Sequence, residues 1–132
     1  MRRAAIAAAL TASVVLSAPP SPTHALDTPC AQYRPLAVAV GWPRAELDRL
    51  ESICARESKG FARAWNRADP CGGSYGIMQL NACNLTWLKT AGVVRHDMRE
   101  LWSPRRSLIA ALALWKRHGW APWRGTSHTP AS

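Results

Sequence analysis

The residues best suited to chemistry lie between Cys54 and Asn81. Glu57 and Ser58 are followed by a basic and aromatic run, then by the turn Gly72-Gly73-Ser74 and the segment Tyr75–Asn81. A carboxylate at the end of a helix, facing a tight glycine turn and polar side chains, is suited to general acid catalysis. Glu57 is therefore the candidate catalytic residue.

A helix over residues 44–58 is predicted to position Glu57. Its apolar residues recur at spacings of three and four and so share one face: Leu47, Leu50, Ile53 and Cys54. Glu57 continues this face, where the helix C-terminus and the adjoining core would both favour the protonated form that a general acid needs. In the alternative interpretation, Glu57 is a surface glutamate that pairs with Arg56 or Lys59.

The remaining elements are predicted from periodicity and turn residues. We expect helices over residues 85–90 and 105–117, one helical turn over 98–102, and an extended segment over 75–81. The later helix should bury a face made of Leu108, Ile109, Leu112 and Trp115. Residues 26–40 should form an irregular arm, because two prolines interrupt any pattern there.

The first 25 residues are typical of a secretory signal peptide. A basic start, Met1-Arg2-Arg3, precedes an apolar run from Ala4 to Ala18, and Thr23-His24-Ala25 suits a cleavage site. We therefore expect a signal peptide over residues 1–25, one domain over 26–125 and a flexible tail over 126–132. The protein would be secreted or periplasmic, in the cell envelope, with no membrane segment after cleavage; the alternative is an uncleaved membrane anchor.

Four cysteines follow the predicted signal peptide: Cys30, Cys54, Cys71 and Cys83. An even number of cysteines in a small exported domain indicates disulfides, here two. Three pairings are possible, and we favour Cys71–Cys83, which would tie the ends of the glycine turn and the strand, with Cys30–Cys54 as the second bond. Zinc is disfavoured because the sequence has no C-x-x-C, and we expect neither a metal nor a cofactor.

The chain is basic, with a formal net charge of +9. A basic exported protein accumulates on acidic polymers of the envelope, although the charge can equally serve solubility. The basic residues are scattered and form no nucleic-acid motif, so we expect no nucleic-acid partner.

The order of motifs resembles that of the lysozyme-like lytic transglycosylases. Glu57-Ser58, then GSYGIMQLN from Gly73 to Asn81, then a helix end rich in tryptophan and glycine carry this resemblance, which covers about residues 44–123. It implies a mainly α, α+β lysozyme-like fold with a short β-like element beside a glycan cleft. One departure is that residues 113–116 read Ala-Leu-Trp-Lys where many members have Ala-Tyr-Asn.

The resemblance also implies a substrate and a mechanism. Glu57 would protonate the oxygen between N-acetylmuramic acid and N-acetylglucosamine in peptidoglycan, then take the proton of the C6 hydroxyl as a 1,6-anhydro ring closes. Ser74 would orient Glu57 or the acetamido group. The other substrate-binding candidates are polar groups for sugar amides and rings for sugar faces: Tyr75, Met78, Gln79, Asn81 and Trp115, with Trp65, Trp120 and Trp123 as further rings. Each tryptophan can instead belong to the core.

Two other functions stay open. A hydrolysing muramidase would use Asp69 as the second carboxylate, because glycosidases normally employ two. A non-catalytic cell-wall-binding module would keep the fold without the activity, and a cationic antimicrobial protein would explain the charge but not the motif. In each case we expect a monomer that binds peptidoglycan glycan strands.

Overall fold

The computed structural model describes residues 15–18 and 28–125, and it is mainly helical with one small sheet. Its helices are α1 (Arg34–Ala39), α2 (Leu47–Ser58), α3 (Leu85–Thr90) and α4 (Pro104–His118). The strands are β1 (Trp65–Asn66), β2 (Ser74–Tyr75) and β3 (Leu80–Asn81). Short 3-10 turns connect them: η1 (Ala31–Tyr33), η2 (Arg44–Glu46), η3 (Pro70–Gly72), η4 (Ala82–Asn84), η5 (Met98–Trp102) and η6 (Ala121–Trp123).

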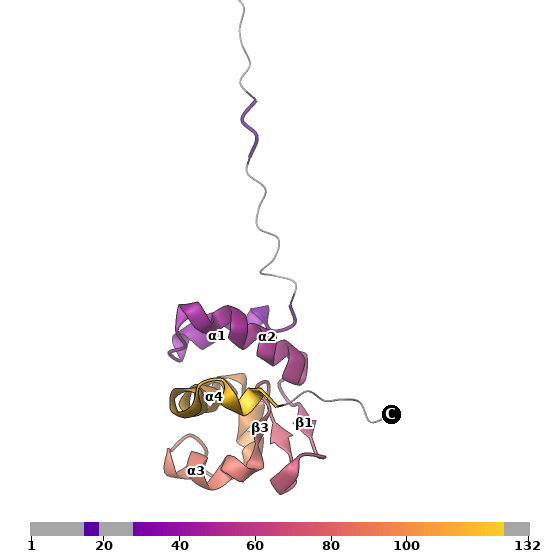
Figure 1. Cartoon of the computed structure of the whole chain (residues 1–132), viewed down its shortest axis with the longest axis vertical. Coiled ribbons are helices and arrows are strands. Elements are labelled where there is room, and N and C mark those ends of the chain that lie inside the picture. Colours follow the sequence, from indigo (N-terminus) through magenta and orange to yellow (C-terminus); the bar gives the residue numbers. More distant parts are fainter. Residues whose placement is uncertain (1–14, 19–27, 126–132) are drawn as a thin grey trace, which may run out of the picture.

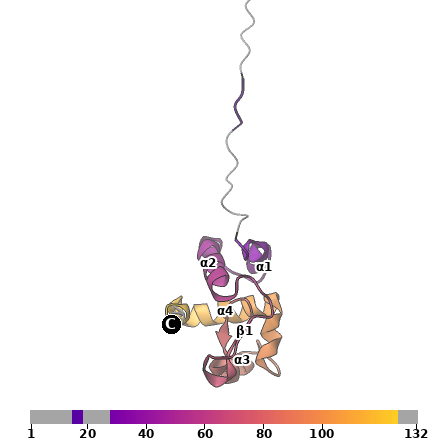
Figure 2. The same cartoon turned by 90° about the vertical axis from the view of Figure 1, so that its right-hand side faces the viewer.

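Helix α4 lies at the centre of the molecule. Figures 1 and 2 show α1 and α2 on one side of α4, and the sheet and α3 on the other. The three strands are antiparallel in the order β1-β2-β3. The expected combination of a mainly helical chain and a small β element is thus confirmed.

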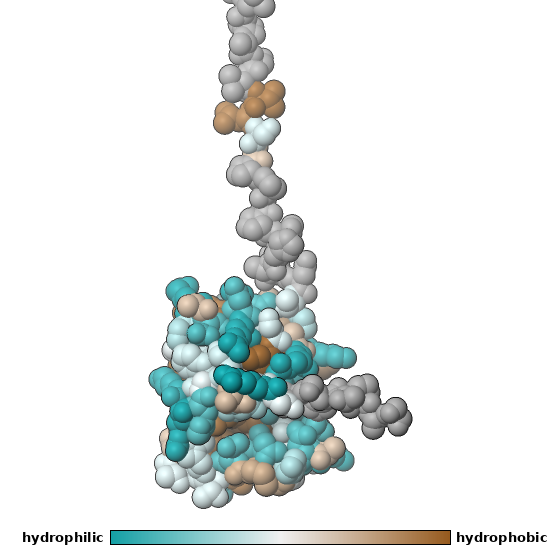
Figure 3. Space-filling model, in the orientation of Figure 1, coloured by the Kyte–Doolittle hydropathy of each residue, from teal (hydrophilic) through white to brown (hydrophobic). Residues whose placement is uncertain are grey.

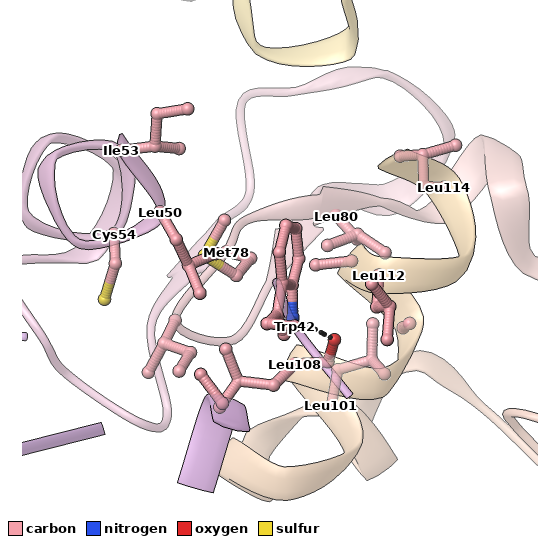
Figure 4. Close-up of a cluster of buried hydrophobic side chains, with 14 of the residues drawn as sticks. Trp42, Leu50, Ile53, Cys54, Met78, Leu80, Leu101, Leu108, Leu112 and Leu114 are labelled. Carbon is pink, nitrogen blue, oxygen red and sulfur yellow. Dashed lines mark hydrogen bonds between the residues drawn. The ribbon is translucent and has the colours of Figure 1, made fainter. Parts of the chain in front are cut away.

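The core forms where α2 faces α4. In Figure 4, Leu50 of α2 points toward Trp42 from one side, and Leu108 and Leu112 of α4 lie next to it on the other. The indole nitrogen of Trp42 donates a hydrogen bond to the Leu108 carbonyl oxygen at 3.0 Å. This bond satisfies the one polar atom of a side chain that is otherwise buried among apolar groups.

The helical faces that point outward are polar. Hydrophilic residues dominate the face shown in Figure 3, with hydrophobic residues scattered between them.

The helices over 85–90 and 98–102 are confirmed at those bounds, and the one expected over 105–117 extends from Pro104 to His118. The helix expected over 44–58 begins as the 3-10 turn η2 and continues as α2.

The prediction of a single extended segment over 75–81 is wrong. Strands β2 and β3 pair with each other, with Tyr75 opposite Leu80, so the intervening residues form a tight turn. Gly76 begins this turn with a φ of +78°, and a Cβ there would lie 2.2 Å from the Leu101 carbonyl oxygen. Only glycine fits both the backbone angle and this contact with η5.

The prediction of an irregular arm over 26–40 is also wrong. Arg34–Ala39 forms helix α1, and Pro35 lies in its first turn. A proline is tolerated there because the first N–H groups of a helix have no partner within it. Ala37 is buried against the core.

Both favoured disulfides are present, Cys30–Cys54 and Cys71–Cys83. The first ties the segment before α1 to α2, and the second ties η3 to η4.

Among residues 15–18 and 28–125, no helix is long and apolar enough to span a membrane. The predicted signal peptide, apart from residues 15–18, and the predicted tail over 126–132 lie outside the described residues.

Candidate functional site

Ser58 fixes the end of α2 against the β2–β3 turn. Its buried Oγ lies 2.8 Å from the carbonyl oxygen of Ile77 and 3.1 Å from that of Cys54, and it accepts a hydrogen bond from the Gly60 backbone N–H at 3.1 Å. The helix ends at Lys59, whose φ of 51° is left-handed. The serine that follows Glu57 therefore sets the position of the glutamate relative to the turn.

The Glu57 side chain is only 4% exposed, and it makes an ion pair with Arg56. Arg56 donates to Oε1 of Glu57 from Nη2 at 2.8 Å and from Nε at 3.1 Å, and Nη2 also lies 2.7 Å from the Trp123 carbonyl oxygen. The burial expected of a catalytic acid and the pairing expected of a structural glutamate are thus both present.

Two hollows meet at Glu57. The first, which we call the inner pocket, has an empty volume of about 670 Å³ including open solvent. Its described lining residues are Glu57, Asp69, Pro70, Ser74, Gln79, Leu80, Asn81, Asn84, Leu114, Pro122 and Trp123.

The second hollow, which we call the outer groove, has a comparable empty volume of about 610 Å³. Its described lining residues are Arg56, Glu57, Ser58, Lys59, Ala64, Trp65, Asn66 and Gln79. Glu57 and Gln79 line both hollows, so together the hollows form a cleft that passes over these two side chains.

A row of polar side chains crosses the sheet at this cleft. Asn66 is opposite Ser74 on β2, and Ser74 is opposite Asn81 on β3. Asp69 joins the row: its Oδ2 accepts a hydrogen bond from Ser74 Oγ at 2.6 Å, and its Oδ1 accepts one from Asn66 Nδ2 at 2.9 Å. Both carboxylate oxygens of Asp69 are therefore held by neighbours.

Gln79 is positioned by the turn that separates β2 from β3. Its backbone is left-handed, with a φ of 48°, and its Nε2 donates to the carbonyl oxygens of Gly76 at 2.9 Å and Ala64 at 3.2 Å. With the amide nitrogen engaged on the protein, the side chain has its carbonyl oxygen for a ligand donor.

Seven of the predicted site residues line the cleft: Glu57, Asp69, Ser74, Gln79, Asn81, Trp65 and Trp123. The other four, Tyr75, Met78, Trp115 and Trp120, lie outside its described lining. Met78 is fully buried, and Trp115 packs on Trp42 and Trp120 with ring centroids 5.4 and 6.0 Å away. Tyr75 stacks on Trp65 at 5.5 Å and lies outside the described linings of both hollows.

The sequence reasoning did not identify Asn66 and Asn84 as cleft residues. The Asn84 side chain donates to the Asn81 carbonyl oxygen at 3.2 Å and lines the inner pocket. Asn66 lines the outer groove. Their amide side chains suit sugar binding, which was a usable signal in the sequence. Their position at the cleft depends on how the strands pair, which the sequence did not reveal.

The described part of the chain contains no group of three histidine, cysteine or acidic side chains that could hold a metal ion. No family model matches this sequence, and no curated protein or solved structure is significantly similar to it.

Proposed function

We propose that the protein is a peptidoglycan lytic transglycosylase with Glu57 as the general acid and base. The observation that supports this most directly is the position of Glu57, a nearly buried carboxylate where the inner pocket meets the outer groove. A polymer lying along such a cleft would have sugar units on both sides of the carboxylate. Cleavage within a chain needs this arrangement.

The reaction requires one carboxylate. Glu57 gives its proton to the glycosidic oxygen of the leaving sugar as the bond from that oxygen to C1 breaks. The C6 hydroxyl oxygen of the retained muramic acid bonds to C1, and its proton passes to the Glu57 carboxylate. The products are a shortened strand and a 1,6-anhydro end, no water is consumed, and Glu57 is again protonated.

Arg56 constrains the first step. Its two hydrogen bonds occupy Oε1 of Glu57, which has to be released before that oxygen can meet a sugar. We infer that an entering sugar ring would displace the Arg56 guanidinium from Glu57. Arg56 is half exposed and can move toward solvent.

The polar row supports sugar recognition. N-acetyl groups carry one amide donor and one acceptor, and the side-chain carbonyl oxygens of Gln79 and Asn84 in the cleft can accept from the donor. Ser74 is fixed by Asp69 and is buried beside these amides. The fixed geometry lowers the entropy lost when the sugar binds.

A second candidate, a hydrolysing muramidase, is favoured by one observation: Asp69 lines the same pocket as Glu57. A second carboxylate could activate water or act as a nucleophile. Because both oxygens of Asp69 accept hydrogen bonds from Ser74 and Asn66, we propose that it orders the polar row instead.

The deciding experiment is mass analysis of the products released from purified peptidoglycan. Wild-type protein should release 1,6-anhydro ends, and Glu57→Gln should release almost none. Asp48→Asn is the matched control, because Asp48 is on the same helix with a side chain that is 91% exposed. Hydrated, reducing ends would establish the hydrolase, and a folded Glu57→Gln protein with nearly full activity would exclude Glu57 as the acid.

A further inference from the structure

The two halves of the cleft differ in charge. The described lining of the inner pocket contains the carboxylates Glu57 and Asp69 and no basic residue. The described lining of the outer groove contains Arg56 and Lys59, with Glu57 as its one acidic residue. A ligand with an acidic group at one end would therefore be favoured in one orientation over the other.

Lys59 carries the excess charge of the outer groove. It is exposed, and no described carboxylate forms an ion pair with it, whereas Arg56 is already paired with Glu57. The αL backbone at the end of α2 holds Lys59 at the groove. Its ammonium group can therefore be neutralised by a ligand without breaking an ion pair among the described residues.

Trp65 adds an aromatic wall with a second cation. Its side chain lines the outer groove, it is 40% exposed, and its Nε1 donates to the Gly72 carbonyl oxygen at 3.1 Å, which fixes the ring. Arg67 lies outside the described lining of the groove but over this ring, with its guanidinium carbon 4.2 Å from the ring centroid. No described carboxylate forms an ion pair with Arg67 either, so the edge of a planar, oriented guanidinium is available for a carboxylate.

We propose that the outer groove binds the carboxylate-bearing part of an acidic glycan, with Lys59 and Arg67 as the recognising cations and Trp65 as the wall. The inference rests on the proposed function for the identity of the glycan. In a peptidoglycan strand the carboxylate has two sources, the lactyl group of muramic acid or the attached peptide. Because muramic acid alternates with N-acetylglucosamine, either source would favour the register of the strand that places a muramic acid in the outer groove.

Binding measurements on the mature Glu57→Gln protein test this without cleavage of the ligand. The three ligands are a neutral N-acetylglucosamine oligomer, a strand stripped of peptides, and a peptide-bearing strand. Lys59→Gln and Arg67→Gln should each weaken the binding of acidic strands about two- to fivefold, the range of exposed charge pairs, and leave the neutral oligomer unchanged. The matched control is Lys89→Gln, since Lys89 is exposed in the last turn of α3 and should affect none of the ligands.

The outcomes separate the two proposals. A loss seen with the stripped strand assigns the lactyl carboxylate, and a loss seen only with the peptide-bearing strand assigns the peptide. Equal losses for neutral and acidic ligands, or no loss for either, would overturn the inference even if wild-type protein cleaves peptidoglycan. Charge-dependent binding without any cleavage by wild type would overturn the proposed function and keep the inference, and the absence of any binding would overturn both.

Discussion

Ser74 donates a hydrogen bond of 2.6 Å to Asp69, and both residues line the inner pocket. The other oxygen of Asp69 is held by Asn66, so this carboxylate links the turn before β2 to strands β1 and β2. A group engaged on both oxygens is better placed to order its neighbours than to attack a sugar. This relationship separates the two enzymatic mechanisms.

Asp69→Asn should therefore reduce activity far less than Glu57→Gln. General acid–base catalysis contributes about 10²–10⁴-fold in rate, and only Glu57→Gln should lose a factor of that size. An asparagine at position 69 can keep a hydrogen bond to Ser74, because a hydroxyl either donates or accepts. The measurement is the initial rate of peptidoglycan solubilisation, with thermal unfolding as the check on folding.

Equal losses for the two variants would contradict this assignment. Such a result would make Asp69 a reacting carboxylate and would replace the transglycosylase with the two-carboxylate hydrolase. The products of the wild-type reaction would then carry reducing ends and no 1,6-anhydro ends.

Ser58→Ala should destabilise the protein. The substitution removes a buried hydroxyl and leaves the Ile77 carbonyl oxygen without that partner. The expected loss is about 1–3 kcal/mol in the free energy of unfolding, measured by denaturant titration. Ser52→Ala is the control, because Ser52 is an exposed serine of α2 that also bonds to a carbonyl oxygen four residues earlier, and its loss should stay within about 0.5 kcal/mol.

The two disulfides should differ in how easily they are reduced. Cys30 and Cys54 are each only 2% exposed, whereas Cys71 and Cys83 are exposed. A mild reductant should therefore open Cys71–Cys83 first, because a thiolate can reach it. Mass mapping of alkylated peptides over time measures the order of reduction. Labelling of Cys30 or Cys54 before Cys71 and Cys83 would contradict the prediction.

Sequence periodicity predicted α2, α3 and α4, but it missed α1 and the turn between β2 and β3. The stripe that ends in Glu57 predicts α2 because side chains at spacings of three and four share a helical face. The turn between β2 and β3 was missed because Ile77 and Met78 are apolar, as strand residues often are. They are buried as part of a turn, and Gly76 makes this possible by its contact with Leu101.

Some of the predicted binding residues lie at the cleft and others pack elsewhere, and the tertiary packing decides which. Ser74 and Asn81 lie together at the cleft because β2 and β3 pair with these two residues opposite each other. Trp115 does not reach it, because its position on α4 directs the ring to Trp42 and Trp120. Periodicity identifies a buried helical face, but it does not say whether that face meets the core or a cleft.

The last prediction concerns stability in acid, and it depends on Glu100. Hydrogen bonds from the backbone N–H groups of His96 and Arg95, together with the charge of Arg106, lower the pKa of Glu100. Oε1 lies 2.6 Å from the His96 nitrogen and 2.9 Å from the Arg95 nitrogen, and Oε2 lies 2.6 Å from Arg106 Nη1. These bonds fasten the loop after α3 to η5 and α4.

Because the pKa of Glu100 is lower in the folded state than in the unfolded state, its contribution to stability is complete above the unfolded value. That contribution is lost as the pH falls through the lower folded value. Glu100→Gln should therefore destabilise the protein at pH 7, and the difference from wild type should shrink as the pH is lowered through this range. Chemical unfolding of both proteins over a pH series measures the difference, and a gap that stays constant down to acid pH would show that the charge of Glu100 is not what stabilises the loop.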